Sequence, residues 1–172
     1  MTGGGDPIQA RPARVSDAPA IAVIYNQGIE DRVATFETEP RSPKQIARWF
    51  DSCRPIVVAE DTDGTTVAFA SSSAYRDRPC YAGIAEFSVY VRRDWRGRGA
   101  GQVALAALIE AASAAGLWKL VSRVFPENAA SRALLRRMGF REVGVYQRHG
   151  QLDGIWRDCV IVERLLYSPP AR

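Results

Sequence analysis

Residues 86–101 read EFSVYVRRDWRGRGAG, and this stretch decides the fold of the chain. Its first half alternates and is rich in β-branched and aromatic side chains, which predicts a strand. Good helix formers with an apolar stripe follow Gln102, so we expect a helix after the glycine-rich turn. Three glycines leave the backbone open to a ligand, and the free N–H groups and dipole of a helix N-terminus favour an anion. The turn therefore predicts a site for a phosphate or a pyrophosphate.

The spacing of the glycines narrows the choice of phosphate ligand. A dinucleotide-binding fingerprint needs a glycine where the chain has Gln102, and the Gly-Lys-Ser/Thr of the nucleotide triphosphatase loop is absent. The pattern Arg96-x-x-Gly99-x-Gly101 after a strand resembles the pyrophosphate loop of the GCN5-related N-acetyltransferases (GNAT), whose ligand is acetyl-coenzyme A (acetyl-CoA). For this loop alone, a glycine-rich connection with surface arginines is an equal alternative.

Length and composition indicate one globular domain of 172 residues, which must hold coenzyme and substrate together. The formal net charge of +4, carried by scattered basic residues, suits an anionic cofactor and argues against nucleic-acid binding. Three cysteines without CxxC spacing and a single histidine predict a reduced, cytoplasmic protein without a metal site. No apolar run approaches bilayer length, so we expect no membrane anchor.

Capping, turn and periodicity signals divide the chain into elements. We expect residues 1–7 to be a disordered leader, residues 8–167 to form the domain and residues 168–172 to be a frayed tail. Helices are expected from the N-cap Ser16 to about residue 30, from Ser42, from Gln102 to Gly116, and from the N-cap Asn128 to Gly139. Strands are expected at residues 8–13, 55–60, 67–75, 81–92, 118–124, 143–146 and 155–166.

The order of these elements predicts an α/β (α+β) fold with a mixed, mostly antiparallel sheet of about seven strands and helices on both faces. An Asp-Gly turn at residues 61–64 predicts that the second and third strands pair antiparallel. Residues 147–154 are expected to form a polar loop between the last two strands. That loop and the extended segment around Phe36 could close over a small acceptor.

Further motifs extend the resemblance over nearly the whole chain. In order, they are Ile24-Tyr25-Asn26, Ala34-Thr35-Phe36, Glu39-Pro40, Tyr75-Arg76-Asp77-Arg78, Tyr81, residues 86–91, the glycine-rich turn, Asn128-Ala129-Ala130-Ser131, Met138-Gly139-Phe140 and Gly154-Ile155-Trp156-Arg157-Asp158. Together they resemble the phosphinothricin/methionine sulfone N-acetyltransferase branch of the superfamily, which also contains enzymes acting on arsinothricin. The resemblance implies the GNAT fold, a role in antibiotic or herbicide resistance, and a homodimer, which the apolar segment 156–166 weakly favours.

Transfer of an acetyl group to nitrogen needs a base, because a primary ammonium group is not a nucleophile. Glu86 begins the strand that runs into the glycine-rich turn, so it is placed near the reacting end of a coenzyme whose pyrophosphate binds at that turn. The resemblance implies that Glu86 is the general base of a direct transfer. The alternative is a structural carboxylate paired with a nearby arginine.

The resemblance also assigns residues to acetyl-CoA. The backbone of residues 89–91 would hold the pantetheine arm like an added strand, and one N–H group there could polarise the thioester oxygen. Asn128 would reach the coenzyme from the start of a short helix, and a plain N-cap is its compatible alternative role. The expected coenzyme residues are Val89, Tyr90, Val91, Arg96, Gly97, Arg98, Gly99, Ala100, Gly101, Asn128 and Ser131.

The chain departs from the family pattern at Leu135, where relatives often have a His or Tyr that helps the departing thiolate or holds the substrate. Tyr81, Tyr90 and water are candidate replacements, and a thiolate with a pKa of about 8–9 leaves without much help. His149 lies in a polar segment, where we expect an exposed role rather than catalysis.

Arg76 and Arg78 lie just before the base-bearing strand and offer planar, bidentate donors to an anionic acceptor. Phe36 and Tyr81 are expected to wall the same pocket. With the resemblance, these residues predict a small amino-acid-like amine that carries a carboxylate and a second oxyanion or oxidised sulfur group. The alternatives are that both arginines are solvated loop charges, that the acceptor is a protein amine, or that the chain binds acetyl-CoA without catalysis.

Overall fold

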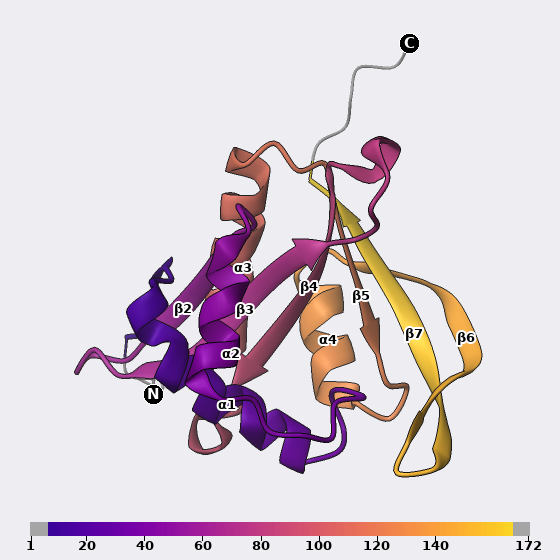
Figure 1. Cartoon of the computed structure of the whole chain (residues 1–172), viewed down its shortest axis with the longest axis horizontal. Coiled ribbons are helices and arrows are strands. Elements are labelled where there is room, and N and C mark those ends of the chain that lie inside the picture. Colours follow the sequence, from indigo (N-terminus) through magenta and orange to yellow (C-terminus); the bar gives the residue numbers. More distant parts are fainter. Residues whose placement is uncertain (1–6, 167–172) are drawn as a thin grey trace, which may run out of the picture.

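The computed structural model describes residues 7–166. The tail expected over residues 168–172, and all but the last residue of the leader expected over residues 1–7, lie outside the described residues. Within them, seven strands form one sheet in the order β1-β2-β3-β4-β5-β7-β6, and only β4 and β5 are parallel neighbours (Figure 1). The predicted mixed, mostly antiparallel sheet is therefore confirmed. The strands are β1 (Gln9–Pro12), β2 (Ile56–Glu60), β3 (Thr66–Ala74), β4 (Ile84–Val91), β5 (Lys119–Val124), β6 (Arg141–Leu152) and β7 (Ile155–Leu165).

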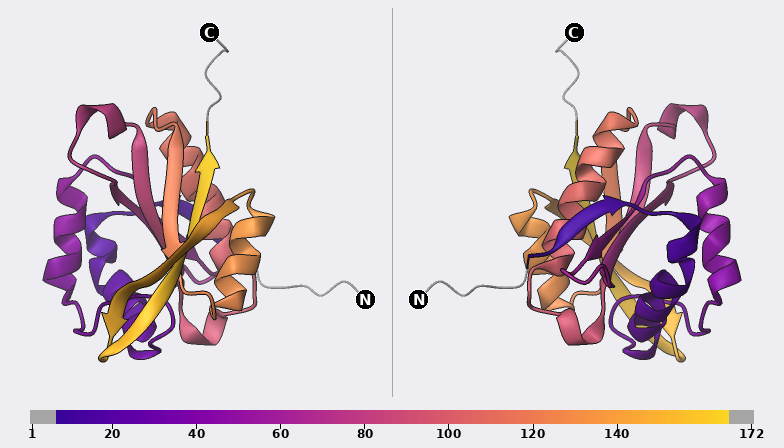
Figure 2. Two further views of the ribbon diagram at one scale, coloured as in Figure 1. Left: turned by 90° about the vertical axis from the view of Figure 1, so that its right-hand side faces the viewer. Right: turned by 90° about the vertical axis from the view of Figure 1, so that its left-hand side faces the viewer.

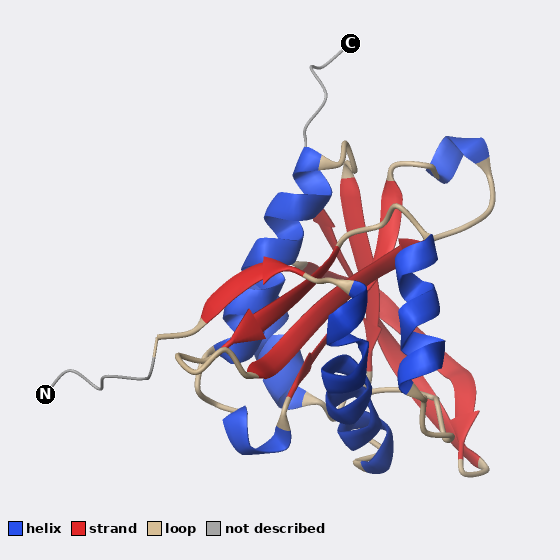
Figure 3. Ribbon diagram, turned by 60° about the vertical axis from the view of Figure 1, so that its left-hand side comes forward, coloured by secondary structure: helices blue, strands red, loops and turns tan. Residues whose placement is uncertain are grey.

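Helices cover both faces of the sheet, as predicted (Figures 2 and 3). One face packs against α1 (Ala18–Glu30) and α2 (Pro43–Ala47), and the other packs against α3 (Ala100–Ala114) and α4 (Ala129–Arg137). In the described part of the chain, four short 3-10 helices connect the elements: η1 (Val15–Asp17), η2 (Arg48–Asp51), η3 (Pro79–Tyr81) and η4 (Arg93–Trp95). None of the helices within residues 7–166 is long and apolar enough to cross a membrane.

Alternating side chains of β4 point into two separate cores. Ala85 and Phe87 pack in the larger core, which contains the buried face of α3. Tyr90 packs against the smaller core, which lies under α1 and α2. Because alternate residues of a strand share a face, Glu86 and Ser88 lie on the α1 and α2 side together with Tyr90.

The two central strands β4 and β5 pair only over a short length and then diverge (Figure 1). Ser122 Oγ donates a 2.8 Å hydrogen bond to the Phe87 carbonyl just beyond the last paired residues. The side of β4 that faces β5 is therefore left without a partner strand from Ser88 onwards. The paired residues are Ile84 with Lys119, Ala85 with Leu120 and Glu86 with Val121.

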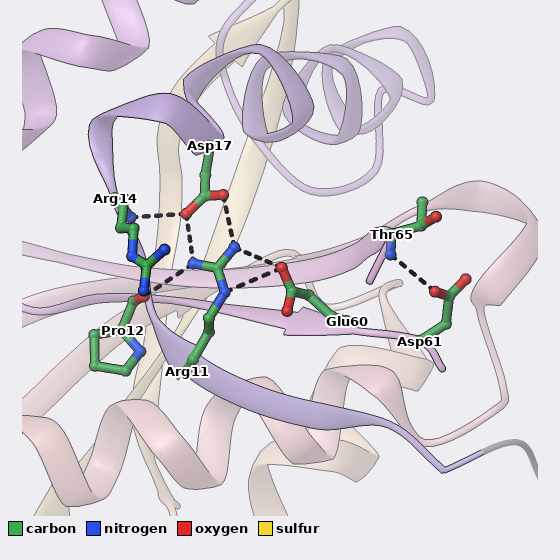
Figure 4. Close-up of polar contacts among 7 residues, drawn as sticks. All are labelled: Arg11, Pro12, Arg14, Asp17, Glu60, Asp61 and Thr65. Carbon is green, nitrogen blue, oxygen red and sulfur yellow. Dashed lines mark hydrogen bonds and ion pairs between the residues drawn. The ribbon is translucent and has the colours of Figure 1, made fainter. Parts of the chain in front are cut away.

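Arg11 of β1 ties the N-terminal segment to the sheet (Figure 4). Its guanidinium donates to both carboxylate oxygens of Asp17 at 2.8 Å, and its Nε donates to Glu60 of β2 at 3.0 Å. Asp17 also accepts the backbone N–H of Arg14 at 2.7 Å, so the Asp17 side chain holds η1 in place. The first long helix consequently begins after η1, and the prediction that Ser16 caps it was wrong.

The Asp-Gly turn between β2 and β3 forms as predicted. Oδ1 of Asp61 accepts the N–H groups of Asp63 at 3.0 Å and of Thr65 at 2.9 Å, and Gly64 adopts a φ of +78°. The two strands pair antiparallel over their length. A short side chain that satisfies backbone donors and a glycine with positive φ together account for this turn.

The polar loop expected at residues 147–154 is wrong, because β6 and β7 form one long hairpin (Figure 1). Its tight turn is Asp153-Gly154, and these residues adopt φ of +51° and +78°. A two-residue type I′ turn requires positive φ at both positions, which favours Asp-Gly. The strand expected to begin at Tyr81 also begins later, because Tyr81 belongs to η3 and β4 starts at Ile84.

Candidate functional site

The glycine-rich turn leads from η4 into α3, as predicted. Gly97 and Gly99 adopt φ of +77° and +89°, and Gly99 is the N-cap of α3. A Cβ on either glycine would meet no atom within 4 Å, so the space beside the turn is open. No side chain of the described residues caps α3, and the Gln102 N–H donates to the Gly99 carbonyl at 3.0 Å, so the N–H groups of Ala100 and Gly101 are the ones left for a ligand. This arrangement fits the pyrophosphate of a coenzyme.

The two arginines of the turn differ in what they contact. Arg96 forms an ion pair with Asp31 at 2.6 Å, beside the end of α1, and its Nε donates to the Val91 carbonyl at 3.3 Å. Arg98 lies over the Trp95 ring at 5.1 Å from the centroid, and it has no acidic ion-pair partner within residues 7–166. Arg98 is therefore the cation that the turn offers to a phosphate, whereas Arg96 also fastens α1 to the turn.

A first cavity, of about 90 Å³, lies where β4 and β5 diverge. Four of the residues predicted to bind the coenzyme, Val89, Tyr90, Asn128 and Ser131, line it together, although they come from a strand and a helix far apart in the sequence. Leu135, which occupies the position of the family's His or Tyr, lines the same cavity and is buried. Val91 and the residues of the glycine-rich turn are not part of this lining.

Asn128 links α4 to the connection between α1 and α2. Its Oδ1 accepts the Ser131 N–H at 3.1 Å, which confirms the predicted N-cap. Its Nδ2 donates to the Val33 carbonyl at 3.1 Å. Asn128 therefore holds the two segments that flank the first cavity, and its contact with a coenzyme stays a prediction.

A second cavity, of about 290 Å³, adjoins the first on the α1 and α2 side of the sheet. Glu86 lines this cavity. Phe36 also lines it and packs edge-on against Phe125, with ring centroids 4.9 Å apart. Gly150 of β6 lies against the Phe36 ring, since a Cβ there would be 2.8 Å from Phe36 Cε1. Segment 147–154 thus contacts a residue of the cavity wall through Gly150, which belongs to a strand rather than to a loop.

Glu86 shares this cavity with Arg123 of β5. Nη2 of Arg123 lies 3.1 Å from both carboxylate oxygens of Glu86. The exposed fractions are 30% for the Glu86 side chain and 44% for the Arg123 side chain, so a ligand can reach both. We did not predict Arg123 as a site residue. The local signal was weak, because β5 reads KLVSRV and Arg123 is one of its three polar or charged residues. The partner of Arg123 depends on the parallel pairing of β4 and β5, which no local pattern reveals.

Arg76, Arg78 and Tyr81 lie on the connection between β3 and β4, outside the linings of both cavities. Arg76 lies over the Tyr75 ring at 5.2 Å from the centroid, and Tyr75 packs edge to face with Tyr81. Both arginines are exposed. Their contact with an acceptor stays a prediction.

A third cavity, of about 300 Å³, lies beside the second and shares Ser88 and two tyrosines with it. Ser71 and Ser73 of β3 and Arg48 of η2 give it a polar lining. These residues were not predicted, although a run of three serines within an apolar strand was visible in the sequence.

His149 is exposed, and its ring centroid lies 4.9 Å from that of Tyr146 on β6. It lines none of the three cavities described above. Within residues 7–166, no group of three His, Cys, Asp or Glu side chains is arranged to hold a metal ion.

Comparisons with known proteins agree with this geometry. The acetyltransferase (GNAT) domain family matches residues 8–141. An L-methionine sulfoximine/L-methionine sulfone acetyltransferase of Pseudomonas aeruginosa is 38% identical over 157 residues, covering 89% of this chain and 91% of the relative. A phosphinothricin N-acetyltransferase of Streptomyces coelicolor is 33% identical over 165 residues, covering 92% of this chain and 96% of the relative. A solved phosphinothricin acetyltransferase of Sinorhizobium meliloti, in complex with acetyl-CoA, has a TM-score of 0.85 at 30% identity and covers 92% of this chain and 88% of that chain. The chain therefore belongs to the GNAT family and is an acyltransferase.

Proposed function

We propose that the chain is an N-acetyltransferase that moves the acetyl group of acetyl-CoA to the α-amine of a small amino-acid-like acceptor. The acceptor is of the phosphinothricin, methionine sulfone, methionine sulfoximine or arsinothricin type. The observation that carries this proposal is the position of Glu86, in a cavity that adjoins the coenzyme cavity where β4 and β5 diverge. The activities named for the relatives support the acceptor class.

The residues of the turn and of the first cavity fit acetyl-CoA, which supplies the acetyl group as a thioester. The open N–H groups of α3 and the Arg98 guanidinium would hold the pyrophosphate. The unpaired side of β4 would hydrogen-bond the pantetheine arm through backbone groups of residues 89–91. Asn128 and Ser131 would contact the same arm from α4.

Glu86 is the proposed general base of a direct transfer. It accepts a proton from the acceptor ammonium, the freed amine bonds to the acetyl carbon, and the C–S bond breaks to release the thiolate of coenzyme A. The nitrogen then loses its second proton to this thiolate, directly or through water, which gives the neutral amide and the thiol of coenzyme A. Cys159 lines the second cavity together with Glu86, so a transfer through an acetylated cysteine is the alternative. Burial raises the pKa of the Cys159 thiol and so disfavours the thiolate that this intermediate needs. Transfer straight to the amine is therefore favoured.

The dimensions of the site support a small acceptor. The second and third cavities have volumes of about 290 and 300 Å³, which is the lower end of the range for small-molecule pockets. Phe36 forms part of the wall of the second cavity, where it packs against Phe125, whereas a peptide acceptor would need a continuous groove. Arg76, Arg78 and Tyr81 are proposed to complete the acceptor site from the connection between β3 and β4.

A homodimer is part of the proposal. Large apolar side chains are exposed on both strands of the terminal hairpin, at 49–61% of their maximal area. Exposed apolar residues gathered on one element are typical of an interaction surface. They are Val143, Val145, Tyr146, Ile155, Trp156 and Leu165.

The test is a thiol-release assay with acetyl-CoA and a panel of acceptors. The panel contains phosphinothricin, methionine sulfone, methionine sulfoximine and arsinothricin, together with a peptide with a free N-terminus and a polyamine. We expect turnover with at least one of the four small amino acids and a far lower kcat/KM with the peptide and the polyamine. Turnover confined to the peptide or the polyamine would refute the proposed acceptor, and no turnover with any amine would refute catalysis. Acetylation of phosphinothricin or arsinothricin would support a role in resistance.

A further inference from the structure

We propose that Arg123 binds the α-carboxylate of the acceptor and that the Glu86–Arg123 pair selects amines that carry an adjacent carboxylate. This inference rests on the proposed function, because it assigns a recognition residue to the same reaction. It adds a residue that lies next to the reacting amine, in contrast to Arg76 and Arg78 on the connection between β3 and β4.

The first support is the position of Arg123 relative to the divergence of the strands. Glu86 and Val121 are the last paired residues of β4 and β5, and Arg123 follows Val121 by two residues. It therefore shares the face of the sheet on which Glu86 lies. Arg123 lines both the coenzyme cavity and the acceptor cavity, so its guanidinium lies where donor and acceptor must meet.

The second support is the charge of the acceptor cavity. Arg123 is the one basic side chain among the described residues that line it. The two acidic residues of the lining are Glu86 and Glu37, and Glu37 is paired with Arg41. The recorded polar contacts of the Arg123 side chain within residues 7–166 all go to Glu86, so most of its five N–H donors are available to a ligand.

The third support is the match between this ion pair and an amino-acid zwitterion. The α-ammonium and the carboxylate of an amino acid sit on one carbon, so they can face Glu86 and Arg123 at the same time. Each charge of the protein then exchanges its protein partner for a partner on the acceptor, and no charge is left unpaired. An amine without a carboxylate would have to separate Glu86 from Arg123 and leave the guanidinium, which is 44% exposed, with water in place of an anion, so the lost ion pair is not replaced.

The exchange also connects recognition to catalysis. In the structure the Arg123 Nη2 lies 3.1 Å from both carboxylate oxygens of Glu86 and stabilises their negative charge. When a carboxylate of the acceptor takes the guanidinium, Glu86 is free to accept the ammonium proton. Arg123 is thus a specificity-determining residue for acceptors that bring their own carboxylate.

The experiment compares methionine sulfone with 3-(methylsulfonyl)propylamine, which has the same amine and sulfone but no carboxylate. Arg123→Ala and Arg123→Gln are measured beside the wild type. Arg141→Ala is the matched control, because Arg141 also pairs with a glutamate but is exposed and lines none of the three cavities. Binding of acetyl-CoA, followed by thermal shift, verifies that each variant is folded.

We expect the wild type and Arg141→Ala to prefer methionine sulfone strongly. Loss of a charged, bidentate hydrogen bond should reduce that preference in kcat/KM by about tenfold to a hundredfold in both Arg123 variants, mainly through the KM of the amino acid. An unchanged preference in a folded Arg123 variant would overturn the inference. An equal loss with both acceptors would also overturn it, because Arg123 would then act on the reacting centre that the two acceptors share. The proposed function fails separately, by absence of wild-type turnover with any amino acid.

Discussion

Replacing Glu86 by Gln tests the proposed base, because Gln keeps the shape of the side chain and removes the proton acceptor. Nη2 of Arg123 lies 3.1 Å from each Glu86 oxygen, so the amide oxygen of Gln can still accept one of these hydrogen bonds. The expected loss is therefore that of general-base catalysis, about a hundredfold to ten-thousandfold in kcat. This corresponds to about 2.7–5.4 kcal/mol of transition-state free energy.

Coenzyme affinity should respond differently to the same substitution. Glu86 does not line the first cavity, so the Kd for acetyl-CoA should change by no more than about twofold, the effect of an ordinary substitution outside a contact. The loss in kcat should also shrink as the pH rises, because the fraction of free amine grows about tenfold per pH unit below the pKa of the acceptor amine. At high pH the acceptor is already a neutral amine in solution, so the enzyme no longer needs a base to remove its proton.

The assay is thiol release at saturating acetyl-CoA between pH 6 and pH 10, about the range over which the amine loses its proton. Glu142→Gln is the control, because Glu142 pairs with Arg132 at 2.8 and 2.9 Å but lines none of the three cavities. It should keep wild-type kcat. A Glu86→Gln variant with wild-type kcat at pH 6 would refute the base, and so would a loss that is constant over the whole pH range.

The remaining predictions concern the coenzyme turn, the N-terminal ion pairs and the dimer. Gly99→Asp should abolish the rise in Tm that acetyl-CoA gives the wild type. The control Gly64→Asp changes a glycine with a similar positive φ and an equally open Cβ position, so it should lower the basal Tm but keep the rise. Equal rises in both variants would place the pyrophosphate elsewhere. Asp17→Asn should reduce the free energy of unfolding at pH 7 by about 1–3 kcal/mol, since the hydrogen bonds from Arg11 lower the pKa of Asp17. That contribution is present above the ordinary Asp pKa of 3.8 and is lost as the pH falls through the lowered value, so urea unfolding should show the two proteins converging at low pH; a constant difference down to pH 2 would contradict the ion pair. Light scattering should show a dimer at micromolar concentration for the wild type and a monomer for Val145→Glu/Trp156→Glu, and a monomeric wild type would reject the dimer.

Elements set by neighbouring residues were predicted well from the sequence. The strand–turn–helix around residues 86–116, the Asp61–Gly64 turn and the N-cap Asn128 all formed as expected, because each depends on the φ preference or hydrogen bonding of a few adjacent residues. The same reasoning failed at Ser16, because the Asp17 side chain accepts the Arg14 N–H and the Arg11 guanidinium and so holds η1 ahead of the helix. Asp17 is held by Arg11, whose guanidinium also contacts Glu60 on another strand.

The terminal hairpin is a second place where neighbouring residues did not predict the structure fully. Its turn residues Asp153 and Gly154 carried the local signal for a type I′ turn, yet the polar residues before them favoured a loop. The structure makes them part of a strand because β7 supplies partners for residues 150–152, while residues 147–149 form an irregularity in the register between Tyr146 and Gly150. An edge strand can keep such polar side chains in solvent. Pairing with a neighbour outweighed the composition of the segment.

The sequence by itself determined the local frame of the site: a base-bearing strand that ends in an anion-binding turn, and the order of elements that makes a mixed sheet. Tertiary structure alone decided which charges meet in that frame. Arg123 lies beside Glu86 because β4 and β5 are parallel over three residues and then diverge, and Arg96 is partly neutralised because α1 ends beside the turn. The positions of Arg123 and Arg96 both result from packing two cores on opposite faces of one sheet. The residues next to either arginine in the sequence do not indicate such long-range packing.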